Sequence, residues 1–373
     1  LNVPNKGEQS QTCLGSAERK EHLHKENVPN LRFPEFSGEW EKTTIGKILT
    51  IGNGRDYKHL TEGNIPVFGT GGYMLSVNEY LYDGESVFIG RKGTINKPFF
   101  FSGKFWTVDT LFYTHKFVDV LPYFVYGLFQ RINWNNYNEA SGVPSLSKST
   151  IEKISINVPI VEEQRKIANL MSLLDDRIAT QIKIIEKLES LIRGLYERLF
   201  NIDGAAYIQL GNVAKIQKGQ QINGEKLSEI GSYYVMNGGV VPSGYLEDFN
   251  TPANTISISE GGSCGYVQYN SVPFWSGGHC YTLIEHINSF NYKYLFHYLK
   301  FKEQSIMALR IGSCLPNIQK KDLERFPILN VSKEEQDKMA CIFDDILDRI
   351  ICERQIALKY EEQKKYLLSN LFI

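Results

Sequence analysis

The chain has 373 residues, and its 41 Lys and Arg side chains nearly balance its 42 Asp and Glu side chains, which gives a formal net charge of −1. This balance excludes a polycationic nucleic-acid-binding tail and a strongly acidic mimic as descriptions of the whole chain. Hydrophobic residues make up 42% of the sequence, which is enough for packed cores in two or three domains. The sequence has no run of about 18 apolar residues, the length that a membrane span needs, and its first residues lack the apolar core of a secretory signal.

In chain order we predict five segments: a polar tail (1–30), a first domain (31–158), a long helix (159–202), a second domain (203–330) and another long helix (331–373). Short aromatic and β-branched runs bounded by glycine, such as 86–89, 97–101 and 111–114, are typical of strands. Short helices are predicted at 121–131 and 292–301. Each domain is therefore expected to be mixed α/β.

An internal repeat relates the two halves of the chain. The matching segments are 45–46 with 210–211, 105–106 with 274–275, 144–154 with 316–326, and 161–168 with 333–340. Because they keep their order and nearly constant spacing, we interpret them as a duplication and not as chance similarity.

Each predicted long helix carries apolar residues at steps of three or four, which indicates one apolar face. We assign to this seam, on the first helix, Ile167, Leu170, Leu174, Ile178, Ile182, Ile185 and Leu188, and on the second, Met339, Ile342, Ile346 and Ile350. A helix of roughly 38 residues is about 57 Å long, which exceeds what one small domain can cover, so we expect the helices to pair. The predicted fold class is α+β: two similar mixed α/β domains separated by two long antiparallel helices that form a coiled coil with pseudo-twofold symmetry.

Six cysteines occupy positions 13, 264, 280, 314, 341 and 352. They lack Cys-x-x-Cys spacing and an accompanying histidine cluster, so we expect no metal site. Their even number also fits disulfides, but a large chain without a recognisable export signal favours reduced thiols.

The repeated entry into the long helices resembles a known family. Pro144–Ile154 with Pro159–Gln164, and again Pro316–Phe326 with Glu334–Gln336, resemble the specificity subunit of type I restriction–modification systems. Leu31–Phe36 is similar to the opening of such subunits in Gram-positive bacteria. The resemblance covers about residues 28–373.

This resemblance implies a non-catalytic, cytoplasmic bacterial subunit that reads double-stranded DNA with a split recognition sequence. Each domain would read one half-sequence, and the helices would set the spacing and bind two methyltransferase subunits. Restriction and translocation subunits would join the larger complex. S-adenosylmethionine, ATP and Mg²⁺ are then expected in partner subunits and not in this chain, and no membrane is involved.

Candidate DNA-binding residues follow from side-chain chemistry, because Lys and Arg neutralise phosphates and Arg, Lys, Asn and Gln read base edges. In the first domain they are Arg91, Lys92, Thr94, Asn96, Lys97 and Lys148; in the second they are Lys215, Lys218, Gln220, Gln221, Asn237, Lys320 and Lys321. The alternative for each is an ordinary solvated loop residue.

Two other functions compete with DNA recognition. A coiled-coil scaffold that binds only proteins would lack salt-dependent DNA affinity. A fused methyltransferase would need a cofactor loop, and the glycine-rich segment Val67–Gly72 resembles one. However, a strand-like run follows that segment where a helix is needed, and no Asn/Asp-Pro-Pro-aromatic tetrad is present. We therefore predict a turn at Val67–Gly72.

Overall fold

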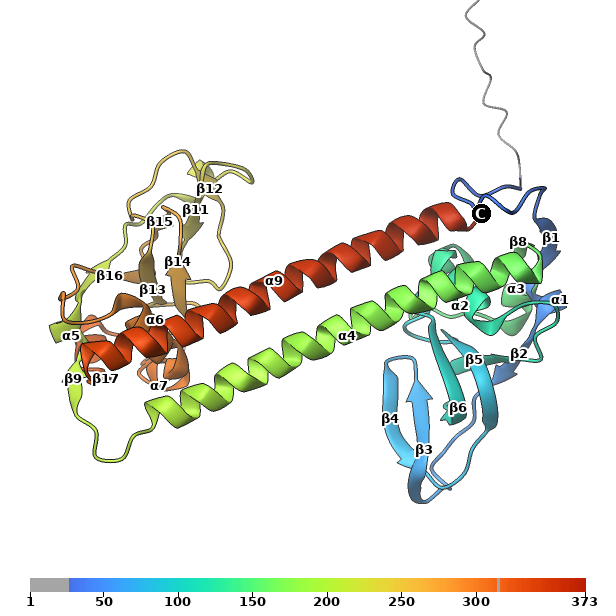
Figure 1. The fold of residues 1–373 in the computed structure, drawn as a ribbon, viewed down its shortest axis with the longest axis horizontal. Helices are drawn as coiled ribbons and strands as arrows, with labels where there is room; N and C mark the ends of the chain where they lie inside the picture. The colour runs from blue at the N-terminus through green and yellow to red at the C-terminus, as the bar shows by residue number, and fades with distance from the viewer. Residues whose placement is uncertain (1–26, 314–315) are drawn as a thin grey trace, which may run out of the picture. The chain divides into compact units, whose positions relative to one another are not determined.

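The computed structural model describes residues 27–313 and 316–373, which form two compact units (Figure 1). Unit 1 comprises the chain up to Arg177 together with Tyr360–Ile373, and unit 2 comprises Ile178–Lys359. Most of the predicted tail, with Cys13 and Cys314, lies outside the described residues. Each long helix contributes to both units.

Unit 1 is built on a six-stranded sheet with the strand order β2-β7-β5-β6-β3-β4. Its elements before the long helix are β1 (Glu41–Thr44), α1 (Ile45–Ile48), β2 (Thr50–Asn53), β3 (Glu62–Gly69), β4 (Gly72–Val77), β5 (Tyr82–Gly90), β6 (Phe99–Thr107), β7 (Leu111–His115), α2 (Pro122–Arg131), η1 (Trp134–Tyr137), α3 (Lys148–Lys153) and β8 (Ser155–Val158). Strands β3 and β6 run parallel, whereas β1 and β8 form a separate antiparallel pair.

Strand β5 lies between β7 and β6 in this sheet, and its second half is buried on both faces. Val87, Phe88 and Ile89 are fully buried. The Phe88 ring packs against Phe68 and Phe105, with centroids 5.4 and 4.7 Å away. Successive side chains of a strand point to opposite faces, so Val87 and Ile89 lie on the other face, which α2 covers.

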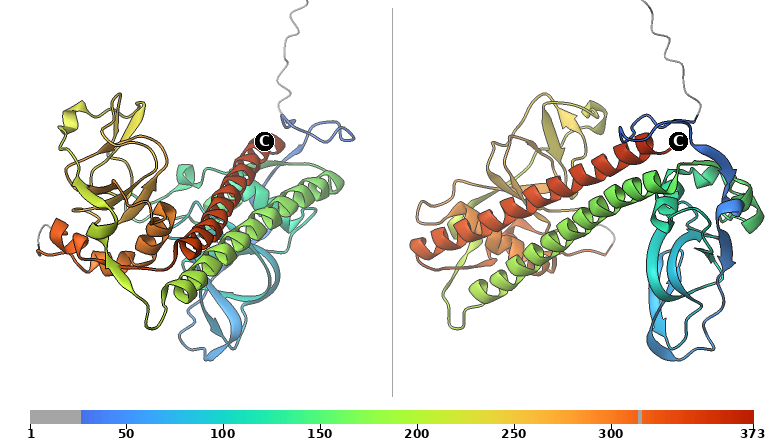
Figure 2. Two further views of the ribbon diagram at one scale, coloured as in Figure 1. Left: turned by 60° about the vertical axis from the view of Figure 1, so that its left-hand side comes forward. Right: turned by 45° about the vertical axis from the view of Figure 1, so that its right-hand side comes forward.

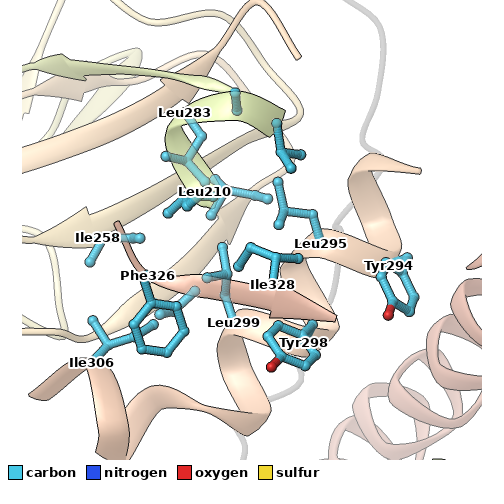
Figure 3. Packing of buried hydrophobic residues seen from close by; sticks show 14 of the residues in the cluster. Leu210, Ile258, Leu283, Tyr294, Leu295, Tyr298, Leu299, Ile306, Phe326 and Ile328 are labelled. Atoms are coloured by element: carbon cyan, nitrogen blue, oxygen red, sulfur yellow. The ribbon is translucent and has the colours of Figure 1, made fainter. Parts of the chain in front are cut away.

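Unit 2 repeats these pairings with strands of equal or smaller length. Its elements are β9 (Tyr207–Gln209), α5 (Leu210–Val213), β10 (Lys215–Lys218), η2 (Gly224–Lys226), β11 (Tyr233–Met236), β12 (Tyr245–Leu246), β13 (Thr255–Ser259), β14 (Val267–Asn270), β15 (Trp275–Ser276), β16 (Cys280–Ile284), α6 (Tyr292–Phe301), α7 (Glu303–Met307), α8 (Lys320–Glu324) and β17 (Pro327–Leu329). The sheets have the orders β10-β16-β13-β14, β12-β11-β15 and β17-β9. Figure 3 shows how Leu210, Ile258, Leu283 and Leu295 converge in its core.

Each strand pairing of unit 1 has a counterpart in unit 2, which confirms the prediction of two similar domains. The parallel pair β3-β6 corresponds to the parallel pair β11-β15, and the antiparallel pair β2-β7 corresponds to β10-β16. The continuous strand β6 corresponds to β14 and β15, which are separate. Pro273 lies between them, and a proline has no N–H to donate to a ladder.

The long helices are α4 (Val161–Phe200) and α9 (Lys333–Leu371). Their 40 and 39 residues correspond to about 60 Å each. The repeated glutamine of the Glu-Glu-Gln motif joins each helix to its domain. Gln164 accepts a hydrogen bond from the backbone N–H of Leu121, and Gln336 accepts one from Asn291, at 2.9 and 2.7 Å. Because Leu121 and Asn291 are the N-caps of α2 and α6, the motif fixes the same helix–helix junction twice.

Helices α4 and α9 lie side by side and antiparallel (Figures 1 and 2), as predicted. In unit 1 Lys364 forms an ion pair with Asp175, and in unit 2 Gln181 donates to the Glu353 carboxylate. Gln181 and Glu353 are 172 residues apart, which makes them equivalent positions of the repeat. The two repeated helices therefore meet at equivalent residues.

The C-terminal phenylalanine of each helix packs on a short helix of a domain. Phe372 follows α9 and stacks on Phe124 of α2, with centroids 5.2 Å apart. A Cβ added to Gly127 would lie 2.4 Å from the Phe372 ring, so this contact requires glycine at 127. The equivalent Phe200 is fully buried and packs on Tyr298 of α6 at 5.3 Å.

The structure departs from the predicted seam at two positions. Ile182 and Ile342 are both 45% exposed, whereas Phe343, which the seam did not include, is fully buried. Phe343 packs on Tyr196 with a centroid distance of 4.6 Å. The regular spacing of three or four residues favoured Ile342. In the structure, the adjacent face of α9, which carries Phe343, packs on the aromatic core of unit 2.

This difference can be tested with two adjacent substitutions. Phe343→Ala should lower the free energy of unfolding by about 3–5 kcal/mol, because it opens a cavity in the core. Ile342→Ala should cost less than about 1 kcal/mol, because the side chain is largely in water. Urea denaturation of the two variants would contradict the observed packing if Ile342→Ala were the more damaging.

Candidate nucleic-acid interface

In unit 1, three predicted DNA-binding residues line one solvent-open hollow of about 630 Å³. They are Arg91 and Lys92, which follow β5, and Lys148, which begins α3. The rest of the wall comes from the end of β2, the β6–β7 connection, Phe112 of β7 and the segment before α3, and it includes the carboxylates of Asp109 and Glu139, so three cations face two anions. The structure therefore collects cations that are far apart in the sequence.

Backbone hydrogen bonds fix the loop that carries Arg91. Its N–H donates to the carbonyl of Thr110 at 2.8 Å, and its carbonyl accepts from Leu146 at 2.9 Å. The guanidinium donates to the carbonyl of Asp109 at 3.3 Å and lies 5.9 Å from the Phe112 ring centroid. Arg91 is thus held against the wall of the hollow while remaining exposed.

The other candidates of unit 1 are placed differently. Asn96 and Lys97 are exposed in the same loop but do not line the hollow, and Thr94 is half-buried beside them. Lys148 forms an ion pair with Glu152 at 3.6 Å, which leaves it less available to a phosphate.

In unit 2 the position equivalent to Arg91 carries the opposite charge. The N–H of Glu260 donates to the carbonyl of His279, as that of Arg91 does to Thr110, and its carbonyl accepts from Ile318. Its carboxylate pairs with Lys218 at 2.8 Å and accepts a hydrogen bond from the Tyr281 hydroxyl at 2.9 Å. Burial, together with this carboxylate, raises the pKa of Tyr281, so the hydroxyl stays a donor.

The remaining candidates of unit 2 fall into two groups. Lys215 and Lys320 line a small hollow in which Glu285 and Glu324 pair with them at 2.9 and 3.5 Å, and Lys321 is exposed nearby. The two glutamines follow the C-terminal end of β10, and Asn237 follows β11. The Asn237 side chain accepts from the N–H of His279 at 3.2 Å, and the exposed Gln221 lies over Gly278.

Sequence reasoning overlooked the segment after β2. Tyr57 and Lys58 line a hollow of about 410 Å³ that shares Asp109 with the wall described above. The glycine-rich segment Val67–Gly72 forms the end of β3, a tight turn and the start of β4, and Thr70 lies against the Arg91 loop at Gly93. The internal repeat could have identified this segment. Gly54-Arg55 aligns with Gly219-Gln220, and Gln220 was already a candidate.

A further hollow of unit 1, of about 660 Å³, has the wrong charge for a phosphate backbone. Glu39, Glu41 and Asp119 line it, with Lys47 as its cation. Carboxylates repel phosphate, so nucleic acid is better matched to the Arg91 hollow.

No group of three or more His, Cys, Asp and Glu side chains that could hold a metal ion occurs within 27–313 and 316–373. In the same residues, every helix is too short or too polar to cross a membrane.

Comparison with known proteins places the chain in a family. The family model described as "Type I restriction modification DNA specificity domain" matches it twice, at residues 37–190 and 203–361. The chain therefore belongs to this family and contains two copies of its domain. It is 36% identical over 120 residues to a provisionally named type I specificity subunit of Mycoplasma pneumoniae, and 32% identical over 161 residues to one of Mycoplasma genitalium. These matches cover 32% and 42% of this chain and the same shares of the relatives.

Solved structures agree on the fold. The crystal structure of a type I restriction–modification S subunit from M. genitalium superposes with a TM-score of 0.75 at 18% identity, covering 93% of this chain and 99% of that chain. A second structure, from work on complex assembly and conformational transition of the type I system, gives a TM-score of 0.52 at 16% identity and covers 88% and 95%.

The packing of the unit 2 loops predicts a difference in thiol reactivity. Burial raises the pKa of Cys280 to about 11, so its thiolate fraction at pH 8 is on the order of 10⁻³. Cys341 and Cys352 are exposed. Alkylation of the native chain at pH 8, followed by peptide mass spectrometry, should label these two well before Cys280. Equal rates would show that the loops do not pack on Cys280, and the denatured chain gives the reference for full labelling.

Proposed function

We propose that this chain is the sequence-specific DNA-recognition subunit of a type I restriction–modification complex and reads a bipartite target. The observation that carries the proposal is the twofold match to a DNA specificity domain. Two copies in one chain supply two reading surfaces, one for each half of a split sequence. The chain itself contributes recognition and no catalytic group.

The site geometry supports DNA as the ligand. The hollow of unit 1 gathers Arg91 and Lys92, on a loop that backbone hydrogen bonds hold in place, with Lys148 at the start of α3. Fixed cations suit phosphate contacts, and polar loop residues beside them suit base edges. Unit 2 has Glu260 at the position equivalent to Arg91 and carries glutamine and asparagine on neighbouring loops, which fits a second, different half-sequence.

We propose two methyltransferase subunits and restriction–translocation subunits as partners, in the bacterial cytoplasm. S-adenosylmethionine, ATP and Mg²⁺ would be bound by those partners. Two further relatives, from Methanocaldococcus jannaschii and Escherichia coli, are named specificity subunits of type I restriction enzymes, which supports a place for this chain in such a complex. A scaffold that binds only proteins would not require the Arg91 hollow. A fused methyltransferase would require a cofactor-binding loop at Val67–Gly72, where this chain has a tight turn between two strands.

Modified-base mapping of host DNA, with and without this gene, tests the proposal directly. We expect methylation at one split motif to vanish when the gene is deleted and to return with a plasmid copy. An identical methylation pattern in both strains, with the cognate methyltransferase genes expressed, would refute the recognition role.

The cationic hollow leads to a quantitative prediction. In the complex with its methyltransferase subunits, Lys92→Ala should weaken binding to all DNA sequences alike and reduce the slope of log affinity against log salt by about 0.9, the value for one phosphate contact. Lys47→Ala, which removes a lysine from the acidic hollow of the same unit, is the matched control and should leave the slope unchanged. Equal slopes for the two variants would exclude Lys92 from the interface.

A further inference from the structure

The two units share a second repeated feature, a glycine followed by one polar residue directly after the second strand of the domain. In unit 1 it is Gly54-Arg55 after β2, and in unit 2 it is Gly219-Gln220 after β10. The glycine is the same in both copies, but the polar residue differs.

A tryptophan holds the backbone of the polar residue in each unit. The indole N–H of Trp106 donates to the carbonyl of Arg55 at 2.9 Å, and that of Trp275 donates to the carbonyl of Gln220 at 3.1 Å. The backbone N–H is held as well. Arg55 donates to the carbonyl of Thr107, and Gln220 to that of Ser276, each at 2.8 Å. Thr107 and Ser276 directly follow the two tryptophans, so the same two hydrogen bonds form in each unit.

The preceding glycine permits this close approach. A Cβ on Gly54 would lie 1.9 Å from the carbonyl oxygen of Val108, and one on Gly219 would lie 2.2 Å from that of Gly277. Neither space can hold a side chain, since the obstructing atoms belong to the backbone. Each unit therefore presses the same loop against the turn that follows its tryptophan strand.

The polar side chain itself is left available. Arg55 and Gln220 are both exposed, and no residue of the described ranges gives either side chain a hydrogen bond or an ion pair. The neighbouring candidates are already engaged: Arg91 with the carbonyl of Asp109, and Lys218 with Glu260. The backbone of each residue is held in place, and its polar side chain has no hydrogen bond within the described residues to give up when it meets a base edge.

From this repeated geometry we infer that Arg55 and Gln220 are equivalent base-reading residues, one in each target-recognition domain. The inference rests on the proposed function and assigns the chemistry of each contact. Arginine forms two hydrogen bonds with O6 and N7 of guanine, and glutamine forms two with N6 and N7 of adenine. Unit 1 thus reads a guanine, and unit 2 reads an adenine. Trp106 and Trp275 are the positioning residues.

Arg55→Gln tests the assignment in unit 1. Once base mapping has defined the motif, the complex with the methyltransferase subunits is titrated with duplexes in which each pair of the unit 1 half-site is replaced in turn. Wild type should prefer G·C over A·T at one position by about tenfold or more. In Arg55→Gln the preference at that position should shift to A·T, with all other positions unchanged. Lys47→Gln, which removes a charge elsewhere in unit 1, should retain the wild-type preference.

Gln220→Arg should shift one position of the other half-site from A·T to G·C. Trp106→Phe keeps an aromatic ring in the core but removes the indole N–H, and it should relax discrimination at the Arg55 position alone. A merely structural tryptophan would instead weaken binding to every duplex alike.

The outcomes separate this inference from the proposed function. If wild type methylates a gene-dependent split motif but Arg55→Gln retains the same base preferences at every position, the inference is overturned and the recognition role stands. If wild type yields no gene-dependent motif, the proposed function fails, and the inference fails with it.

Discussion

The structure depends on covering the apolar faces of two helices that are too long for either domain to cover alone. Helices α4 and α9 achieve this by packing on each other, and at their C-terminal ends Phe200 and Phe372 pack on α6 and α2. Gln164 and Gln336 fix the opposite ends by hydrogen bonds to the N-caps of the same short helices. Each domain is thus fixed to the start of one long helix and the end of the other.

A polar pair lies in the middle of this apolar contact. Gln181 and Glu353 are 7% and 2% exposed, and the carboxylate also pairs with Arg349. A buried carboxylate is stable only while its partners remain in place, and any other alignment of the helices would remove Gln181, its partner on α4. Apolar contacts alone would be compatible with several alignments of α4 and α9, whereas the Gln181–Glu353 pair forms in only one of them.

The two domains show how one scaffold supports two chemistries. The backbone hydrogen bonds around Arg91 recur around Glu260, and those around Arg55 recur around Gln220. Only the side chains differ, and they differ in charge or in hydrogen-bonding pattern. Because the hydrogen bonds of Trp106 and Trp275 and the close backbone contacts of Gly54 and Gly219 hold the loops, the exposed residues can change without disturbing the fold. Such separation of scaffold and reading residue is what a duplicated recognition domain requires.

The sequence by itself determined the duplication, the two long helices and the mixed α/β character of the domains, because repeats and apolar periodicity are local in the chain. It also indicated the loop of Arg91 and Lys92, whose composition is distinctive. Tertiary structure alone decided that Phe343 and not Ile342 enters the core, that ion pairs engage Lys215 and Lys320, and that Arg55 stands beside Trp106. Each of these depends on contacts between residues far apart in the chain, and neither composition nor periodicity records which distant side chains will meet.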